Sequence, residues 1–328
     1  MNKRLDYVDE MKGLAILLVG LGHLFLPHTS EGQLHPCATI IYSFHMSFFF
    51  FLSGYINEKT NGISTKGMGT FIGKKFRSIM VPYFFWVLVA PIFLCNHIPT
   101  DWNEVVDIFN FFPNRHYWFL PVLFLFMLLY LLKYPLEKKG IKADLTYATI
   151  TIGISFFWGG ILHQYFLIVY GIYWASFLLG NCLSKYEKFR NLVMNNWVYG
   201  WCAIILCLAW KFYPIYLTDS IWQSIVNLFL SFMCSFVGSI TLYNFFRKAT
   251  LPECVKKYLG EMGKFSLVIY VVPITLLPQT FVFPSDWNGT LVTVIILLIG
   301  IAMTTLRYLF GRIVFEVPVL RYIMFGKK

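Results

Sequence analysis

The stretch KGLAILLVGLGH, from Lys12 to His23, is a hydrophobic run with a cation at one end and a histidine at the other. In an α-helix, eleven residues turn through about three full turns and rise about 16 Å, so Lys12 and His23 would share one face. With Lys12 at one surface of a hydrocarbon core about 30 Å thick, His23 would lie past the midplane. The stretch therefore predicts a membrane-spanning helix that joins an aqueous anion site to a buried base.

The composition of the chain supports a membrane protein. Its 328 residues are 58% hydrophobic and 13% charged, which is far more apolar than a soluble domain can keep in water. The net charge of +11 raises the alternative of nucleic-acid binding, but the sequence has no basic domain and no RNA-reading motif. We therefore expect an integral membrane protein surrounded by lipids, with no nucleic-acid partner.

The N-terminus and the cysteines leave two alternatives. The charged and then apolar N-terminus also fits a cleavable signal peptide, but PHTSEG after Leu26 lacks the small-residue cleavage pattern, which favours a retained first span. The seven cysteines are scattered, with no C-x-x-C pair and no metal spacing. We expect them to be packing residues, with a Cys37–Cys95 disulfide as the alternative. Neither a metal nor a permanently bound cofactor is expected.

Ten segments are long and apolar enough to span a bilayer. They are residues 8–26, 37–56, 74–94, 116–134, 144–160, 163–183, 194–213, 219–246, 264–281 and 289–310. The fifth and sixth segments are separated only by a turn near His163, and merging them would reverse the orientation of everything downstream.

Positive charge orients these segments. With ten spans and a cytoplasmic N-terminus, 25 of the 27 lysines and arginines lie on the cytoplasmic side, leaving only Arg115 and Lys211 outside. The sequence thus predicts an all-α, polytopic membrane helix bundle of about ten transmembrane helices with both termini cytoplasmic. Because all connections are short, we expect a single transmembrane domain over residues 1–328.

Two histidines are candidates for catalysis. His23 lies on the first segment and His45 on the second, in FHMSFFFFLSGY, at depths from which both could face one cavity. No acidic residue falls in the central part of a predicted span, which favours chemistry at a histidine over ion coupling. A histidine buried without a counter-charge stays neutral, as a general base requires. The alternative for each is a hydrogen bond between helices.

A second group of cations opens the third segment, at Lys74, Lys75 and Arg77. The N-terminal N–H groups of that helix and the positive end of its dipole would face the cytoplasm, which suits a phosphorylated ligand. Since residues i and i+3 share a helix face, Lys74 and Arg77 are the expected pair. The alternative is an ordinary positive-inside anchor.

On the outer side, Arg115, His116 and Trp118 mark the mouth of the fourth segment, in NRHYWFLP. A planar arginine there could orient an anionic or hydroxyl-rich acceptor. Trp118 also fits the aromatic belt of the membrane interface.

As an ordered set, these motifs resemble those of the acyltransferase-3 family of membrane O-acyltransferases, in particular its short fucose 4-O-acetyltransferase-like forms. The resemblance covers the first four segments and the ninth. The matching motifs are Asp9-x-x-Lys12-Gly13 followed by His23, FHMSFFFFLSGY, Lys74-x-x-Arg77 followed by VPYFFW, HYWFLPVLF, and LGEMGKFSLVIYVVP.

The sequence departs from the family pattern in three places. Pro273 stands where the family often has a late histidine. Lys12 and Lys74 keep the positive charge of the family's basic positions but lose the bidentate fork of arginine. We also expect no SGNH hydrolase-like domain of the kind fused to many larger members.

The resemblance implies acyl-coenzyme A, most often acetyl-coenzyme A, as co-substrate and a hydroxyl of a cell-surface or lipid-linked saccharide as acceptor. It also implies a multi-pass protein of the bacterial cytoplasmic (inner) membrane. In this interpretation His23 is the general base, with His45 as the second catalytic candidate. The coenzyme A phosphates would be held by Lys12, Lys74 and Arg77. The acceptor side would be formed by Arg115, His116 and Trp118.

Two other functions remain as alternatives. A transporter or flippase for a saccharide or lipid-linked sugar, without acyl chemistry, would tolerate His23→Ala. A structural subunit that uses polar residues only to join helices would lose stability with that change. The sequence leaves open the acceptor sugar, the acyl group, direct transfer versus an acyl-enzyme, and homo-oligomerisation.

Overall fold

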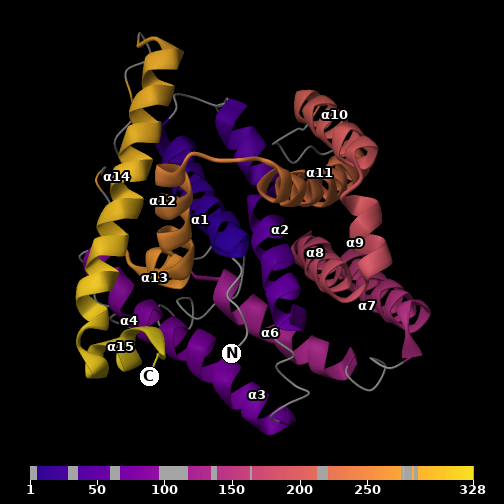
Figure 1. The fold of residues 1–328 in the computed structure, drawn as a ribbon, viewed down its shortest axis with the longest axis horizontal. Coiled ribbons are helices and arrows are strands. Elements are labelled where there is room, and N and C mark those ends of the chain that lie inside the picture. Colours follow the sequence, from indigo (N-terminus) through magenta and orange to yellow (C-terminus); the bar gives the residue numbers. More distant parts are fainter. Residues whose placement is uncertain are drawn as a thin grey trace. The chain divides into compact units, whose positions relative to one another are not determined.

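All regular structure in the described part of the chain is helical, with no strand (Figure 1). The computed structural model describes residues 6–28, 36–59, 67–95, 117–133, 139–162, 165–212, 221–274, 276, 283 and 287–327. The helices are α1 (Asp6–His28), α2 (Pro36–Lys59), α3 (Met68–Lys75), the π-helix η1 (Phe76–Met80), α4 (Val81–Cys95), α6 (Phe119–Lys133), α7 (Ile141–Ile161), α8 (Tyr165–Lys185), α9 (Glu187–Val193), α10 (Asn196–Phe212), α11 (Ile221–Lys248), α12 (Glu253–Lys264), α13 (Ser266–Val271), α14 (Gly289–Phe315) and α15 (Pro318–Phe325).

Helices occupy the predicted spans, with one difference. The fifth and sixth segments are separate, because α7 ends at Ile161 and α8 begins at Tyr165. In the ninth segment, however, α13 ends at Val271, and residues 272–274 are not helical. Pro273 explains this break, because proline lacks the N–H that would continue the helix and its ring clashes with the preceding turn.

Four helices among the described residues are long and apolar enough to cross a membrane. These spans are Pro36–Glu58, Phe166–Lys185, Val226–Lys248 and Gly289–Phe315. Glu187–Val193 and Asn196–Trp210, bent by 60°, add a fifth if they count as one span. The protein is thus an integral membrane protein built of helices, while ten spans and cytoplasmic termini stay predictions.

The chain forms two compact units. Unit 1 comprises residues 1–56, 176–266 and 274–308, and unit 2 comprises residues 57–175, 267–273 and 309–328. The single domain expected over residues 1–328 stays a prediction. Cys37 forms no disulfide with another described side chain, and the Cys95 side chain lies outside the described residues.

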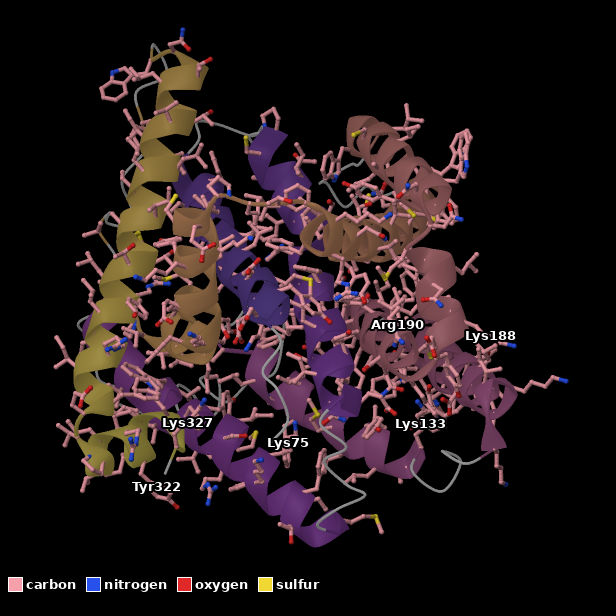
Figure 2. The ribbon with its side chains drawn as sticks, viewed as in Figure 1. Lys75, Lys133, Lys188, Arg190, Tyr322 and Lys327 are labelled. Atoms are coloured by element: carbon pink, nitrogen blue, oxygen red, sulfur yellow. The ribbon has the colours of Figure 1, made fainter. Side chains whose placement is uncertain are left out.

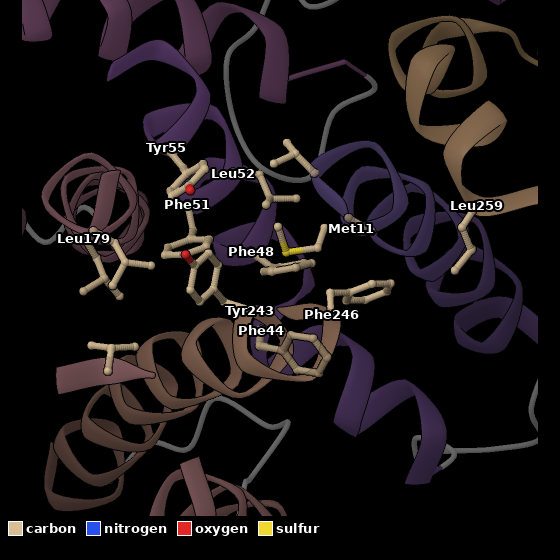
Figure 3. Packing of buried hydrophobic residues seen from close by; sticks show 14 residues of the cluster. Met11, Phe44, Phe48, Phe51, Leu52, Tyr55, Leu179, Tyr243, Phe246 and Leu259 are labelled. Carbon is tan, nitrogen blue, oxygen red and sulfur yellow. The ribbon is translucent and has the colours of Figure 1, made fainter. Parts of the chain in front are cut away.

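The core of unit 1 is an aromatic cluster between α1, α2 and α11 (Figure 3). Phe48 and Phe51 stack with ring centroids 6.1 Å apart, and Phe51 meets Tyr243 edge-on at 6.1 Å. Phe48, Phe51 and Tyr243 are fully buried. Aromatic pairs of this geometry contribute beyond the area that they bury, so they fix the packing of these helices.

Two reciprocal pairs of glycines let helices of unit 1 approach to backbone contact. A Cβ at Gly13 of α1 would collide with the carbonyl of Leu259 on α12, and a Cβ at Gly263 of α12 would collide with the carbonyl of Asp9. Figure 1 shows α12 lying against α1. Small residues permit such close helix crossings, so the DxxKG and LGEMG motifs meet in space.

The second glycine pair joins α2 to α8 in the same way. A Cβ at Gly54 would collide with the carbonyl of Phe177, and one at Gly180 would collide with the carbonyl of Phe51. Gly54 belongs to the LSGY motif. Part of that motif therefore serves helix packing.

Unit 2 contains a buried ion pair between α6 and α7. The Lys133 ammonium on α6 lies 3.2 Å from the Asp144 carboxylate on α7, and both side chains are buried. Beside it, the Tyr130 hydroxyl donates to Glu58 at 2.7 Å. Lys133, labelled in Figure 2, is the last residue of α6, at the end of the predicted span 116–134.

The C-terminal helix α15 packs on α4 within unit 2. Trp86 donates its indole N–H to the carbonyl of Met324 at 3.0 Å, and its ring lies 6.1 Å from that of Phe325. Gly326, with φ +61°, brings the chain against the carbonyl of Arg77, where a Cβ would not fit. Residues 324–326 are thus packed beside Arg77 of the KKFR motif.

Candidate functional site

Lys12 and His23 lie on one unbroken helix. Because α1 runs from Asp6 to His28, the two residues share a stripe of the helix and are about 16 Å apart along its axis. The Lys12 ammonium forms an ion pair with Asp9 at 2.8 Å, with 23% of the Lys12 side chain exposed. Asp9-x-x-Lys12 is therefore an i,i+3 ion pair, and part of the Lys12 charge is already compensated.

His23 and His45 both belong to unit 1 and lie within electrostatic range of each other. His45 is buried on α2. The Nδ1 of His45 is 2.7 Å from the carbonyl of Ile41. Since a carbonyl only accepts, Nδ1 carries the proton and Nε2 of a neutral ring is left as an acceptor. His23 has an exposed side chain.

The KKFR motif lies in unit 2, where the helix changes type. Lys74 and Lys75 end α3, and Arg77 lies within the π-helix η1. The predicted pairing of Lys74 with Arg77 assumes that residues i and i+3 share one face of an α-helix. That assumption does not hold here, because the α-helix gives way to a π-helix at Phe76. Such π-turns inside α-helices are frequent at functional sites.

The cations of this motif differ in their surroundings. The Lys74 side chain is exposed, whereas the Lys75 ammonium lies 5.2 Å from the centre of the Phe71 ring. The Nε of Arg77 is buried and forms no hydrogen bond with any described residue. Lys12 belongs to unit 1, so a joint phosphate clamp with Lys74 and Arg77 stays a prediction.

On the predicted acceptor side, Arg115 and His116 lie outside the described residues. Trp118 is half-buried in unit 2, and its ring stacks with those of Tyr170 and Tyr173 of α8 at 6.0 and 5.6 Å. The tryptophan is thus part of an aromatic layer, which is compatible with both a saccharide platform and an interfacial belt.

Tyr117, beside Trp118, was not singled out by the sequence. Its φ of 66° is unusual for a residue that is not glycine. Its hydroxyl donates to the carbonyl of Val271, the last residue of α13, at 2.8 Å. The HYWFLP and IYVVP motifs therefore meet in unit 2 at Tyr117, a residue with a strained backbone. In the sequence, the only indication that Tyr117 matters is its position within HYWFLP.

The sequence also gave no sign of an arginine–tyrosine cluster in unit 1, formed by Tyr7, Tyr55, Arg190, Tyr243 and Arg247. The hydroxyls of Tyr7 and Tyr55 are 2.8 Å apart, and the rings of Tyr55 and Tyr243 are 5.6 Å apart. Burial, together with the hydrogen bond to Tyr55, raises the pKa of Tyr7 above its usual value. The Tyr7 phenol therefore stays protonated and able to donate. In the sequence, Arg190 and Arg247 belong to the 25 cations that indicate the cytoplasmic side.

Comparison with known proteins supports the interpretation of the motifs. A family model described as an acyltransferase domain matches residues 5–310. Nodulation protein NolL of Sinorhizobium fredii (strain NBRC 101917 / NGR234) is 34% identical over 89 residues, which are 26% of this chain and 24% of that protein. The chain therefore matches about a quarter of the length of that relative. No solved structure matches significantly.

Proposed function

This chain belongs to the acyltransferase-3 family, and on that premise we propose that it is an O-acyltransferase that uses acyl-coenzyme A, most often acetyl-coenzyme A. The acceptor would be a hydroxyl of a cell-surface or lipid-linked saccharide, and the location the bacterial cytoplasmic membrane. The observation that carries the proposal is the unbroken helix α1, which puts Lys12 and His23 on one stripe, with His45 of α2 within electrostatic range of His23.

His23 is proposed as the general base. It takes the proton of the sugar hydroxyl while that oxygen attacks the thioester carbonyl. The new oxygen–carbon bond forms, the carbon–sulfur bond breaks, and the proton returns to the leaving thiolate. Holding both substrates in line at His23 converts an encounter of two molecules into a reaction within one complex.

His45 is proposed to orient His23. Since no carboxylate is available in the central part of the predicted spans, another group must fix the His23 ring. The Nδ1–H of His45 is directed to the carbonyl of Ile41, and its Nε2 remains an acceptor that could receive the N–H of His23. This arrangement would leave the second nitrogen of His23 to accept the sugar proton.

The donor is proposed to bind on the Lys12 side of this stripe. The cations Lys12, Lys74 and Arg77 are suited to the phosphates of coenzyme A. The long pantetheine arm would then bring the thioester toward His23. The predicted acceptor side contains Arg115, His116 and Trp118.

The test is acyl transfer by purified protein in lipid nanodiscs. The protein receives radiolabelled acetyl-coenzyme A and extracted surface polysaccharide, and label in the polysaccharide is counted. Because a general base contributes about 100- to 10,000-fold to a rate, His23→Ala is expected to lower kcat by at least about 100-fold. A folded, inserted His23→Ala protein with a normal rate would refute the general base.

A matched pair of lysines tests the donor side. Lys12→Ala is expected to raise the KM for acetyl-coenzyme A, whereas Lys257→Ala removes the same charge from an exposed position on α12. Equal KM values for the two variants would contradict a role for Lys12 in donor binding. A transporter would leave the polysaccharide unlabelled in every case.

A further inference from the structure

Unit 1 contains two arginines that form no ion pair with any carboxylate of the described residues. Arg190 lies on α9 and Arg247 near the end of α11. Lys12, in contrast, pairs with Asp9 at 2.8 Å. In unit 1, the guanidinium charge of Arg190 and Arg247 is therefore more available to an anionic ligand than the ammonium charge of Lys12.

The two guanidiniums approach the same phenol groups from different helices. The Arg247 guanidinium lies 4.8 Å from the centre of the Tyr7 ring. Arg190 donates to the carbonyls of Leu183 and Ser184 at the end of α8, at 3.4 and 3.1 Å, through one nitrogen. Both arginines are within electrostatic range of the Tyr7 and Tyr243 hydroxyls.

These groups still have hydrogen-bonding capacity for a ligand. A guanidinium has five N–H donors, and Arg190 directs only those of one nitrogen at carbonyls, while Arg247 donates to no described residue. The hydroxyls of Tyr7 and Tyr55 share a hydrogen bond in which either can be the donor, so the Tyr7 O–H can turn to a ligand when Tyr55 donates. Planar guanidinium donors match the oxygens of a phosphate and form strong, charge-assisted hydrogen bonds with it.

We propose that Arg190, Arg247 and Tyr7 form a phosphate-binding site that takes a phosphate of the acyl-coenzyme A donor. This inference rests on the proposed function. Tyr7 precedes Lys12 by five residues, about 7.5 Å along α1 and on the side away from His23. Along the axis of α1 the order is therefore this phosphate site, then Lys12, then the base, so both proposed phosphate contacts lie on the same axial side of His23, as the phosphates of the donor lie on the same side of its thioester.

Two other roles make different predictions. If Arg247 only stacks on Tyr7 and Arg190 only caps α8, their loss lowers stability and leaves affinity unchanged. If the phosphate is that of a lipid headgroup, the site binds anionic lipid and coenzyme A does not depend on it.

The experiment measures binding without acyl transfer. Isothermal titration of coenzyme A is carried out on protein in nanodiscs of phosphatidylcholine, for Arg190→Gln, Arg247→Gln and Arg247→Lys. Lys188→Gln and Lys248→Gln are the matched controls, because Lys188 points outward from α9 (Figure 2) and Lys248 is engaged by Asn196 at 2.8 Å. Each variant is also melted without ligand.

We expect Arg190→Gln and Arg247→Gln to raise the Kd of coenzyme A by about tenfold or more, with the two lysine variants within about twofold of wild type. Arg247→Lys should recover part of the affinity, because it keeps the charge. Titration of 3′-dephospho-coenzyme A tells which phosphate the site takes. If a variant binds this ligand with the same Kd as it binds coenzyme A, the substitution has removed the contact with the 3′-phosphate.

Two results would overturn the inference while leaving the proposed function in place. The first is wild-type affinity for coenzyme A in both glutamine variants. The second is a glutamine variant that binds coenzyme A with wild-type affinity but has lost affinity for the anionic lipid phosphatidylglycerol. That result assigns the site to a lipid headgroup. Wild-type protein that binds no coenzyme A would instead refute the donor in the proposed function, and this inference with it.

Discussion

Gly263→Ala should displace the helix that holds Lys12 and His23. Ordinary van der Waals contact begins at 3.4 Å. A Cβ at Gly263 would lie well inside that distance from the carbonyl oxygen of Asp9. To remove this clash, the backbones of α1 and α12 must move apart by about 1.5 Å. Overpacking of this kind costs about 1–3 kcal/mol of folding free energy. A misplacement of about 1 Å at a reacting group can lower turnover by about 100-fold.

The assay combines stability with turnover. Thermal unfolding in detergent gives the loss of stability, and labelled acetyl transfer in nanodiscs gives kcat for the folded fraction. We expect Gly263→Ala to melt earlier and to turn over about 10- to 100-fold more slowly.

Gly260→Ala is the matched control, since it adds the same methyl group to the same helix at a position where nothing lies within 4 Å. Alanine there should change stability by at most about 1 kcal/mol, in the favourable direction. If Gly263→Ala melted and turned over like Gly260→Ala, backbone contact between α1 and α12 could not be what positions the site.

Three further perturbations test contacts in unit 2. Tyr117→Phe removes the hydrogen bond to the Val271 carbonyl and should cost about 1–3 kcal/mol in denaturant unfolding; no change would mean that water replaces the hydroxyl. Lys133→Ala leaves Asp144 buried without its cation and should cost about 3–5 kcal/mol, most of it recovered when Asp144 is also replaced by leucine. If the double variant melted no higher than Lys133→Ala, the cost would come from packing. Trp86→Phe should free α15 for faster proteolysis of the C-terminus, and unchanged cleavage would contradict that packing.

The hydrophobic runs were sufficient to predict most of the helices. Length and apolar content located α1, α2, α8 and α14 closely, because a helix that is buried in the bundle or crosses a bilayer must be apolar over most of its length. The amphipathic helix α12 was missed, since its polar residues read as a charged connection. The π-helix around Arg77 was missed because residue spacing alone does not reveal a change of helix type.

The positions of site residues relative to one another could be predicted when the residues lie on one helix. They could not be predicted when the residues come from several helices. The alignment of Lys12 with His23 follows from the period of α1, and the nearness of His45 follows from similar depths on neighbouring helices. The Asp9–Lys12 ion pair was not predicted, although its i,i+3 spacing on a helix permits such a pair. Arg190 and Arg247 are far apart in the sequence, and each was explained by membrane topology, so only tertiary packing could bring them to Tyr7.

The contact between α1 and α12 also bears on how the protein would respond to its bilayer. A lone hydrophobic helix tilts or slides when the lipid thickness changes. α1 cannot do so freely, because its backbone is in direct contact with that of α12. α12 is too polar to move into the lipid acyl chains. The height of His23 is therefore set by protein and not by the surrounding acyl chains, and turnover should vary little between short-chain and long-chain lipids.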